Sequence, residues 1–369
     1  MQSLLISTHS LLSSKPNMSS VSASTSSSFF ALLFLSSFLF VSQIHASSQS
    51  VALPFLDGLS YNYYLLTCPK IERIVRKHLE DVFQKDSGQA PGILRLFFHD
   101  CFAQGCDASI LLNGVGQDDE KQNFANIGLR PEAIQTIENI RTIVAKQCLR
   151  VVSCADILVL AAREAVRQSG GPDFDVRLGR KDSLTFNVTA PNNLPAPFAR
   201  TSDLLKKFGD RKFDTTDVVA LSGAHTFGRA HCSSLVNRTI EDNPPIDPDF
   251  KNKLKATCPS NANPSTTLHL DNITPTKFDN MYYINLLNKQ GVFTSDQDIA
   301  QDPRTKDIVS SFATNQKLFF DKFADAFVKV SQLGVLTGFE GEIRKTCFAT
   351  NKGNGLHGIK SVVEMAEMF

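Results

Sequence analysis

The stretch LRLFFHDCFAQGCDASILL, residues 94–112, combines apolar runs with an arginine, a histidine, two aspartates and two cysteines. Arg95 and His99 are four residues apart, about one helical turn, so a helix directs both side chains to one face. The apolar residues between them favour a buried or cleft position. An imidazole exchanges protons near neutral pH, and a guanidinium stabilises a developing anion. The pair therefore suits cleavage of an O–O bond, and a plain helix-surface pair is the alternative.

The same stretch continues into a segment that is rich in oxygen ligands. Asp100, Asp107 and Ser109 lie close together in the sequence, and Gly105 permits a tight turn with exposed carbonyl groups. Calcium prefers many oxygen ligands from one loop, so this segment predicts a calcium site. Aspartates that merely form turns are the alternative interpretation.

Length and charge limit the classes of function. The chain has 369 residues, enough for one large domain or two ordinary ones, with a core that can enclose a cofactor. It carries 38 basic and 37 acidic residues, a formal net charge of +1, and no long basic tract. This balance gives no electrostatic basis for binding nucleic acid or an anionic membrane surface, and we expect neither partner.

Both ends of the chain differ in composition from the rest. Residues 1–46 have the features of a signal peptide, because a short apolar run at 29–41 is followed by small residues. The run is too short to span a bilayer comfortably, which favours a cleaved signal over an uncleaved anchor. We expect a soluble, secreted protein with its folded domain at residues 47–347. Residues 348–369 form either a disordered tail or a removable sorting propeptide.

All eight cysteines lie in the mature part of the chain, and their number is even. An oxidising compartment favours four disulfides, but spacing alone leaves their pairing open. A zinc site on His99, Cys101, Cys106 and Asp107 is the alternative. It lacks the repeated Cys-x2-Cys spacing of structural zinc sites and conflicts with secretion.

Hydrophobic spacing indicates a mainly α-helical fold with very little β-structure. Apolar residues repeat at three and four positions, or run continuously, over residues 71–83, 94–102, 133–145, 154–166, 216–224 and 319–333. The segment 154–166 is apolar nearly all round, so it should be a central buried helix. Loops rich in proline and asparagine, such as NNLPAPF at 192–198, separate the helices. We expect one unit with two helical lobes around a cleft.

A second histidine with a candidate role, His225, lies in DVVALSGAHTFGRAHC, residues 217–232. Small residues on both sides leave room for a flat, bulky group near its imidazole, which suits an axial ligand of haem iron. A buried core histidine is the alternative. His231 is a rival ligand, but it lies outside the frame of small residues.

Several long motifs occur together in one order: RLFFHDCF-x-x-GCDASILL, VVSCADIL, GGPDFDVRLGRKD, NLPAPF, VALSGAHTFGRAHC, TPTKFDNMYY and FTSDQ. In this order they resemble the plant secretory peroxidases, the class III haem peroxidases, over about residues 59–347. The resemblance implies the haem-peroxidase fold, in which distal and proximal helical lobes enclose one haem b. It also implies two Ca²⁺ ions. The family usually has a tryptophan where Phe174 stands, and this chain has none.

The resemblance assigns a role to each residue on the two sides of the haem. His99 matches the distal acid–base histidine, Arg95 the distal arginine, and Asn126 the asparagine that hydrogen-bonds that histidine. His225 matches the proximal iron ligand. Asp296 matches the carboxylate that accepts a hydrogen bond from it, which makes the imidazole a stronger donor.

The resemblance also implies residues for haem contact, donor binding, calcium and disulfides. Phe98 and Phe227 would contact the haem, and Pro195 would receive aromatic donors at its edge. The first calcium site would use the side chains of Asp100, Asp107 and Ser109, the carbonyls of Ala103 and Gly105, and Glu120 through water. The second would use Thr226, Asp271, Thr274 and Asp279, with the carbonyl of Lys277. The disulfides would be Cys68–Cys148, Cys101–Cys106, Cys154–Cys347 and Cys232–Cys258.

The implied activity is reduction of hydrogen peroxide to water with oxidation of phenolic donors in two one-electron steps. Roles in lignification, cell-wall cross-linking, the oxidative-stress response and hydrogen peroxide removal follow from the family. We expect a monomeric glycoprotein in the cell wall, or in the vacuole if the tail is a sorting signal. Two rivals are a catalytically silent haem-binding glycoprotein and a zinc-dependent secreted hydrolase. The intact Arg95, His99 and Asn126 set argues against the first, and the absence of a His-Glu-x-x-His motif argues against the second.

Overall fold

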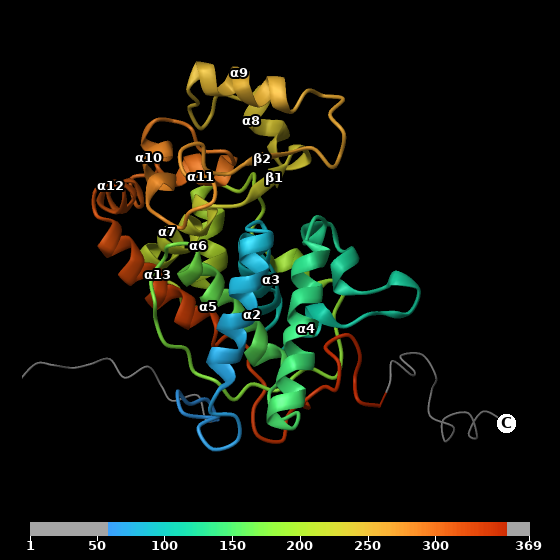
Figure 1. Cartoon of the computed structure of the whole chain (residues 1–369). Coiled ribbons are helices and arrows are strands. Elements are labelled where there is room, and N and C mark those ends of the chain that lie inside the picture. Colours follow the sequence, from blue (N-terminus) through green and yellow to red (C-terminus); the bar gives the residue numbers. More distant parts are fainter. Residues whose placement is uncertain (1–57, 353–369) are drawn as a thin grey trace, which may run out of the picture. The chain divides into compact units, whose positions relative to one another are not determined.

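The structure is a computed structural model that describes residues 58–352 (Figure 1). The predicted signal peptide, residues 1–46, lies outside the described residues, and so does the predicted tail beyond Lys352. Within residues 58–352, no helix combines the length and the apolar character needed to cross a membrane.

The described chain is mostly helical, which confirms the predicted fold class. Its α-helices are α2 (Ile71–Lys85), α3 (Gln89–Ala103), α4 (Pro131–Cys148), α5 (Cys154–Gln168), α6 (Thr201–Gly209), α7 (Thr215–Ser222), α8 (Val236–Ile240), α9 (Pro248–Thr257), α10 (Met281–Leu287), α11 (Thr294–Ile299), α12 (Lys306–Thr314) and α13 (Gln316–Val330). The 3₁₀ turns are η1 (Ser109–Leu111), η2 (Val115–Gln117), η3 (Glu120–Gln122), η4 (Phe124–Asn126), η5 (Ala190–Asn193), η6 (Gly223–Thr226) and η7 (Cys232–Leu235). The strands β1 (Arg229–His231) and β2 (Thr267–His269) pair antiparallel, with Ala230 opposite Leu268.

Local chemistry explains where the central helix α5 begins and ends. The Ser153 side chain accepts a hydrogen bond from the backbone N–H of Asp156 at 3.1 Å, which caps the first turn. Gly170 adopts a φ of +103° just after the last turn, a conformation that favours glycine. Pro172 then follows, and it cannot continue a helix.

Helix α5 is the centre of the first helical group. Every residue from Cys154 to Val166 is buried, as the apolar run predicts, and α2, α3 and α4 pack against this helix. Fully burying a leucine or isoleucine side chain stabilises the fold by about 1.5–3 kcal/mol, and Ile157, Leu158 and Leu160 of this helix are each fully buried.

A second helical group packs beside the first. Helix α13 packs against α7 and α12, and α10 packs against α12 and the turn η6. Helix α13 also contacts α3. One continuous core of buried apolar side chains includes residues of both groups. Phe174, at the position where the family usually has tryptophan, lies edge-on against Phe327 of α13 with ring centroids 5.1 Å apart. The two groups correspond to the two predicted lobes.

Four disulfides join the same cysteines that the resemblance implies: Cys68–Cys148, Cys101–Cys106, Cys154–Cys347 and Cys232–Cys258. No cysteine of the described chain is free. Because Cys101 and Cys106 are bonded to each other, neither sulfur is a thiolate, and the zinc alternative at this loop is excluded.

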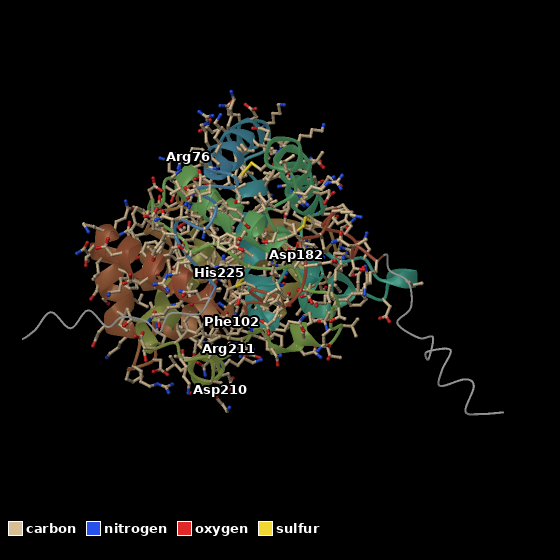
Figure 2. All side chains as sticks on the ribbon, turned by 90° about the horizontal axis from the view of Figure 1, so that it is seen from below. Arg76, Phe102, Asp182, Asp210, Arg211 and His225 are labelled. Atoms are coloured by element: carbon tan, nitrogen blue, oxygen red, sulfur yellow. A yellow bond between two sulfur atoms is a disulfide. The ribbon has the colours of Figure 1, made fainter. Side chains whose placement is uncertain are left out.

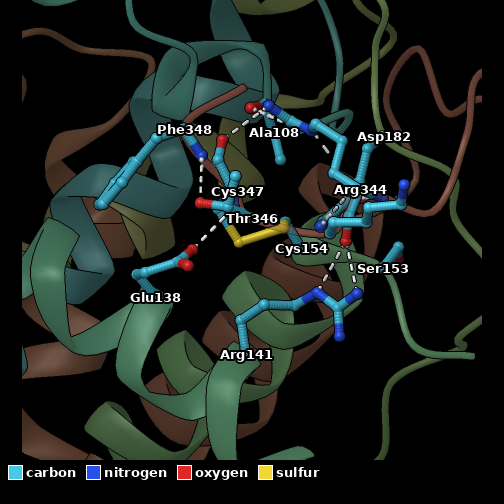
Figure 3. The surroundings of a disulfide bond; sticks show 12 residues. Ala108, Glu138, Arg141, Ser153, Cys154, Asp182, Arg344, Thr346, Cys347 and Phe348 are labelled. Carbon is cyan, nitrogen blue, oxygen red and sulfur yellow. Dashed lines mark hydrogen bonds and ion pairs between the residues drawn. A yellow bond between two sulfur atoms is a disulfide. The ribbon is translucent and has the colours of Figure 1, made fainter. Parts of the chain in front are cut away.

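The Cys154–Cys347 disulfide connects the start of α5 to the C-terminal segment of the domain (Figure 3). Beside it, the buried Arg344 guanidinium donates to the carbonyl of Cys347 at 2.8 Å and to that of Ala108 at 2.5 Å. The backbone N–H of Arg344 donates to Asp182 Oδ2 at 2.9 Å. The C-terminal segment is therefore bonded directly to the loop that carries the predicted first calcium site.

Candidate active site

Helix α3 places Arg95 and His99 one turn apart, as the spacing predicts. Arg95 Nε donates to His99 Nε2 at 3.2 Å, and Arg95 Nη2 donates to the carbonyls of Ala125 and Ile127, both at 3.3 Å. Burial lowers the pKa of Arg95 to about 10. In the described part of the chain this guanidinium is bonded to neutral groups rather than to a carboxylate. It therefore presents positive charge that is available to an anion.

Hydrogen bonds determine which nitrogen of His99 carries the proton. Asn126 Nδ2 donates to the carbonyl of Glu120 at 2.7 Å, so its Oδ1 faces the imidazole, and His99 Nδ1 lies 2.7 Å from that oxygen. Arg95 Nε can only donate, so His99 Nε2 must accept. Both contacts require the proton on Nδ1. The lone pair of Nε2 is then directed to the Arg95 side of the ring.

The charge state of His99 suits a proton acceptor. Burial, and then the positive charge of Arg95, lower the pKa of His99 to about 3, while its hydrogen bond with Asn126 raises it. The imidazole is therefore neutral at physiological pH, which a general base requires.

On the second side, His225 lies in the turn η6, directly after α7. Its Nδ1 lies 2.8 Å from Oδ1 of Asp296, which is 2% exposed in α11. This pairing leaves Nε2 free of hydrogen bonds to any other residue of the described chain, and the side chain is 38% exposed. An accessible imidazole nitrogen opposite a buried carboxylate fits an axial haem ligand. Nδ1 of the rival His231 lies 3.2 Å from a backbone carbonyl, that of Pro264, rather than from a carboxylate.

The segment that follows His225 packs against the helix that carries Arg95 and His99. Gly228 has a φ of +102°, and a Cβ at this position would come within 2.9 Å of Pro91 Cβ in α3. Only glycine allows this close approach of the two segments. The tertiary structure thus brings both histidine-bearing segments to one region.

The predicted haem-contacting phenylalanines lie in different surroundings. Phe98, half-buried beside His99, stacks on Phe102 with ring centroids 4.9 Å apart. The Arg211 guanidinium lies 4.3 Å from the centroid of the Phe102 ring, and Figure 2 labels these two residues. Phe227 is buried and lies edge-on to Phe278 at 5.5 Å. Their contact with haem remains a prediction.

The predicted first calcium site is a buried cluster of oxygens. Asp100, Asp107 and Glu120 are 2%, 7% and 1% exposed. Burial, and then the charge of Asp107, hold the pKa of Asp100 well above its usual range. Glu120 Oε2 is buried without a hydrogen-bond partner. Buried carboxylates that repel one another, with one oxygen unsatisfied, fit Ca²⁺. The other predicted ligands of this segment are Ala103, Gly105 and Ser109, whose backbone N–H donates to Asp107 Oδ1 at 2.9 Å.

The predicted second calcium site comes together from distant parts of the sequence. Thr226 Oγ1 lies 3.4 Å from Asp271 Oδ2 and 3.2 Å from Asp279 Oδ1, and Thr274 Oγ1 donates to the latter at 3.0 Å. The backbone N–H of Lys277 donates to the Thr274 carbonyl at 2.9 Å, which places Lys277 in the same turn. Burial raises the pKa of Asp271, a cost to the ionised carboxylate that a bound cation would offset. This donor set also fits Ca²⁺.

The sequence matches the family model described as peroxidase over residues 75–315. It is 48% identical over 327 residues to Peroxidase 12 of Arabidopsis thaliana, covering 88% of this chain and 91% of that protein. The chain is a plant secretory (class III) peroxidase. It is also 46% identical over 303 residues to Cationic peroxidase SPC4 of Sorghum bicolor, covering 81% and 83% of the two chains. Peroxidases use hydrogen peroxide to oxidise donors, and membership of this family implies haem and typically calcium.

The loop of this peroxidase that carries Pro195 has a support that sequence reasoning missed. Lys207 Nζ, from α6, lies 3.4, 3.2 and 3.3 Å from the carbonyls of residues 192, 193 and 194. The backbone N–H of Ser295 donates to the Pro197 carbonyl at 3.0 Å, which connects the same loop to α11. No local signal in the sequence indicates either contact, because the partners lie in different elements.

A second residue of this peroxidase that sequence reasoning missed is Tyr282 in α10. Its hydroxyl donates to Asp296 Oδ1 at 3.0 Å, the same oxygen that lies against His225. The sequence marks it only as part of the TPTKFDNMYY motif.

Proposed function

We propose that this peroxidase binds one haem b through Nε2 of His225, together with two Ca²⁺ ions. His99, Arg95 and Asn126 would act on hydrogen peroxide at the opposite side of that haem. The observation that carries the proposal is which nitrogen of His99 and of His225 is held by a hydrogen bond to an oxygen. Each has Nδ1 against an oxygen, Asn126 Oδ1 at 2.7 Å or Asp296 Oδ1 at 2.8 Å. The haem, when bound, supplies and withdraws the electrons of the reaction.

The chain's own residues would move the protons. His99 Nε2 would accept the proton from the peroxide oxygen nearer to the haem and return it to the other oxygen, which leaves as water. Arg95 stabilises the negative charge on the departing oxygen through its N–H donors. For this step the bond from Arg95 Nε to His99 Nε2 gives way to the O–H of peroxide. Positioned proton transfer contributes about 10²–10⁴-fold to such a rate.

Aromatic donors would bind at the exposed apolar rim of the site. Phe124, beside Asn126 in η4, is 82% exposed, and Phe198, after Pro195, is 57% exposed. Asn123 Nδ2 donates to the Val188 carbonyl at 2.9 Å and so connects the two loops that carry these rings. Exposed rings on the loops that carry Asn126 and Pro195 favour flat phenolic substrates over ionic ones.

The physiological setting is proposed from composition and family. We propose that residues 1–46 are removed on secretion, and that residues 47–347 act as a monomeric glycoprotein in the cell wall. Vacuolar delivery follows instead if the C-terminal tail is a sorting propeptide. Four disulfides support an oxidising compartment. Lignification, wall cross-linking and peroxide removal in oxidative stress are the corresponding roles.

Two alanine variants test the assignment. His225→Ala should lose the visible haem band, whereas His231→Ala, six positions along, should keep it. His99→Ala should keep the band but react with peroxide orders of magnitude more slowly, because the proton acceptor is missing. His78→Ala, in helix α2, is the matched control. Normal guaiacol turnover by either His225→Ala or His99→Ala would contradict the proposal.

The two rival functions predict different measurements on the purified protein. A silent haem-binding glycoprotein shows the haem spectrum but no change after one equivalent of hydrogen peroxide. A zinc hydrolase contains zinc rather than iron in elemental analysis. We expect iron, a haem spectrum, and a rapid spectral change on adding peroxide.

A further inference from the structure

Helix α10 carries two adjacent buried tyrosines with different partners. The Tyr282 hydroxyl donates to Asp296 Oδ1 at 3.0 Å, whereas the Tyr283 hydroxyl donates to the carbonyl of Val219 at 2.9 Å. Their exposed fractions are 2% and 0%, and their rings lie edge-on with centroids 5.0 Å apart. The two side chains therefore match in burial and chemistry but differ in the group that their hydroxyls bind.

The carboxylate of Asp296 divides its hydrogen bonds unevenly. Its Oδ2 accepts the backbone N–H of Phe293 at 3.0 Å. Its Oδ1 lies 2.8 Å from His225 Nδ1 and also accepts the Tyr282 hydroxyl. Because two donors share Oδ1, negative charge drawn toward the tyrosine O–H is not available to the imidazole N–H.

We propose that Tyr282 is a positioning residue that limits the strength of the His225–Asp296 hydrogen bond and so the electron donation from His225 to haem iron. This inference rests on the proposed function, in which His225 is the axial ligand. A stronger bond from Nδ1–H to the carboxylate gives the imidazole more anionic character and stabilises ferric over ferrous iron. By competing for Oδ1, the tyrosine hydroxyl keeps this effect below its maximum.

The test compares Tyr282→Phe with Tyr283→Phe in the haem-loaded protein. Both changes delete one buried hydroxyl from α10, but only the first removes a donor from Asp296. Tyr282→Phe should shift the Fe³⁺/Fe²⁺ equilibrium toward ferric iron by several-fold to about tenfold, and tenfold is about 59 mV for a one-electron couple. It should also raise the iron–histidine stretching frequency in the resonance Raman spectrum of the ferrous protein. Tyr283→Phe should leave both at the wild-type value.

A double-mutant cycle shows whether the hydroxyl acts through the carboxylate. In the Asp296→Asn background, Tyr282→Phe should no longer change the potential, because the shared anionic oxygen is gone. An equal shift in both backgrounds, or the same shift for Tyr282→Phe and Tyr283→Phe, would overturn the inference.

Poor folding, loss of haem or a missing iron–histidine band also distinguishes the role of Tyr282 from the proposed function. The Raman spectrum reports only the haem-bound fraction, so a Tyr282→Phe protein that folds poorly can still be measured. If Tyr282→Phe binds no haem at all, the role of Tyr282 is merely structural and the inference fails. If wild type lacks an iron–histidine band, or keeps it in His225→Ala, the proposed function itself fails. If wild type shows that band and Tyr282→Phe leaves it unmoved, only the role of Tyr282 fails.

Discussion

Replacing Asn126 by leucine should slow the reaction with hydrogen peroxide, because it removes the bond that selects the tautomer of His99. Asn126 is 1% exposed, and its side chain connects His99 Nδ1 to the carbonyl of Glu120 through two contacts of 2.7 Å. Leucine has a similar volume but neither accepts from the imidazole nor donates to the carbonyl. The change therefore alters hydrogen bonding more than packing.

The size of the effect follows from the cost of an unsatisfied group. A buried N–H without a partner costs about 1–3 kcal/mol. The imidazole of His99 avoids this cost by moving its proton to Nε2, at the loss of the bond that Nε2 accepts from Arg95 Nε. In that tautomer Nε2 cannot accept a proton from peroxide. Since about 1.4 kcal/mol corresponds to tenfold in rate, the second-order rate constant should fall roughly 10- to 100-fold.

The assay is stopped-flow mixing of the haem-loaded protein with excess hydrogen peroxide, followed in the Soret region. Asn123→Ala is the matched control, since Asn123 lies in the same loop but does not bond His99. Its Nδ2 donates to Val188 and Asn192, and its Oδ1 accepts the backbone N–H of Ala125. The rate constant of this control should stay within about threefold of the wild-type value, a smaller change than the loss of one net hydrogen bond would cause. A wild-type rate for Asn126→Leu, or an equal loss in Asn123→Ala, would refute the tautomer argument.

Three further predictions concern the donor loop, the C-terminal disulfide and calcium. Lys207→Met should lower kcat/KM for guaiacol about tenfold, which corresponds to about 1.4 kcal/mol of lost loop order, and should leave the rate with peroxide unchanged. The control Lys206→Met, at an exposed lysine of the same helix, should change neither rate. Replacing Cys154 and Cys347 by serine opens a loop with a sequence separation of 193. In urea unfolding this should cost about 5 kcal/mol, and a loss below about 1 kcal/mol would contradict the loop-entropy estimate. Calcium chelation should lower Tm, and Asp107→Ala should reduce that response; a Tm independent of calcium would argue against both sites.

Several helices could be predicted from the sequence because their signal is local. Helix α2 begins at the predicted residue 71, and α4 and α5 contain the predicted segments 133–145 and 154–166. Helices α10 and α11 were not predicted. They are 7 and 6 residues long, so isolated helices of this length are marginal in water, and tertiary packing determines whether they form.

The sequence by itself determined that Arg95 and His99 share a face, because the helical period converts a spacing of four into a direction in space. Only the tertiary structure decided which groups meet across elements. Asn126 lies 27 residues from His99, and Asp296 lies 71 residues from His225. Spacing carries no distance information once loops and turns intervene, so these roles could be expected only from the resemblance to a family. The sharing of Asp296 Oδ1 between His225 and Tyr282 was not expected even then, since it depends on how α10 packs against α11 and η6.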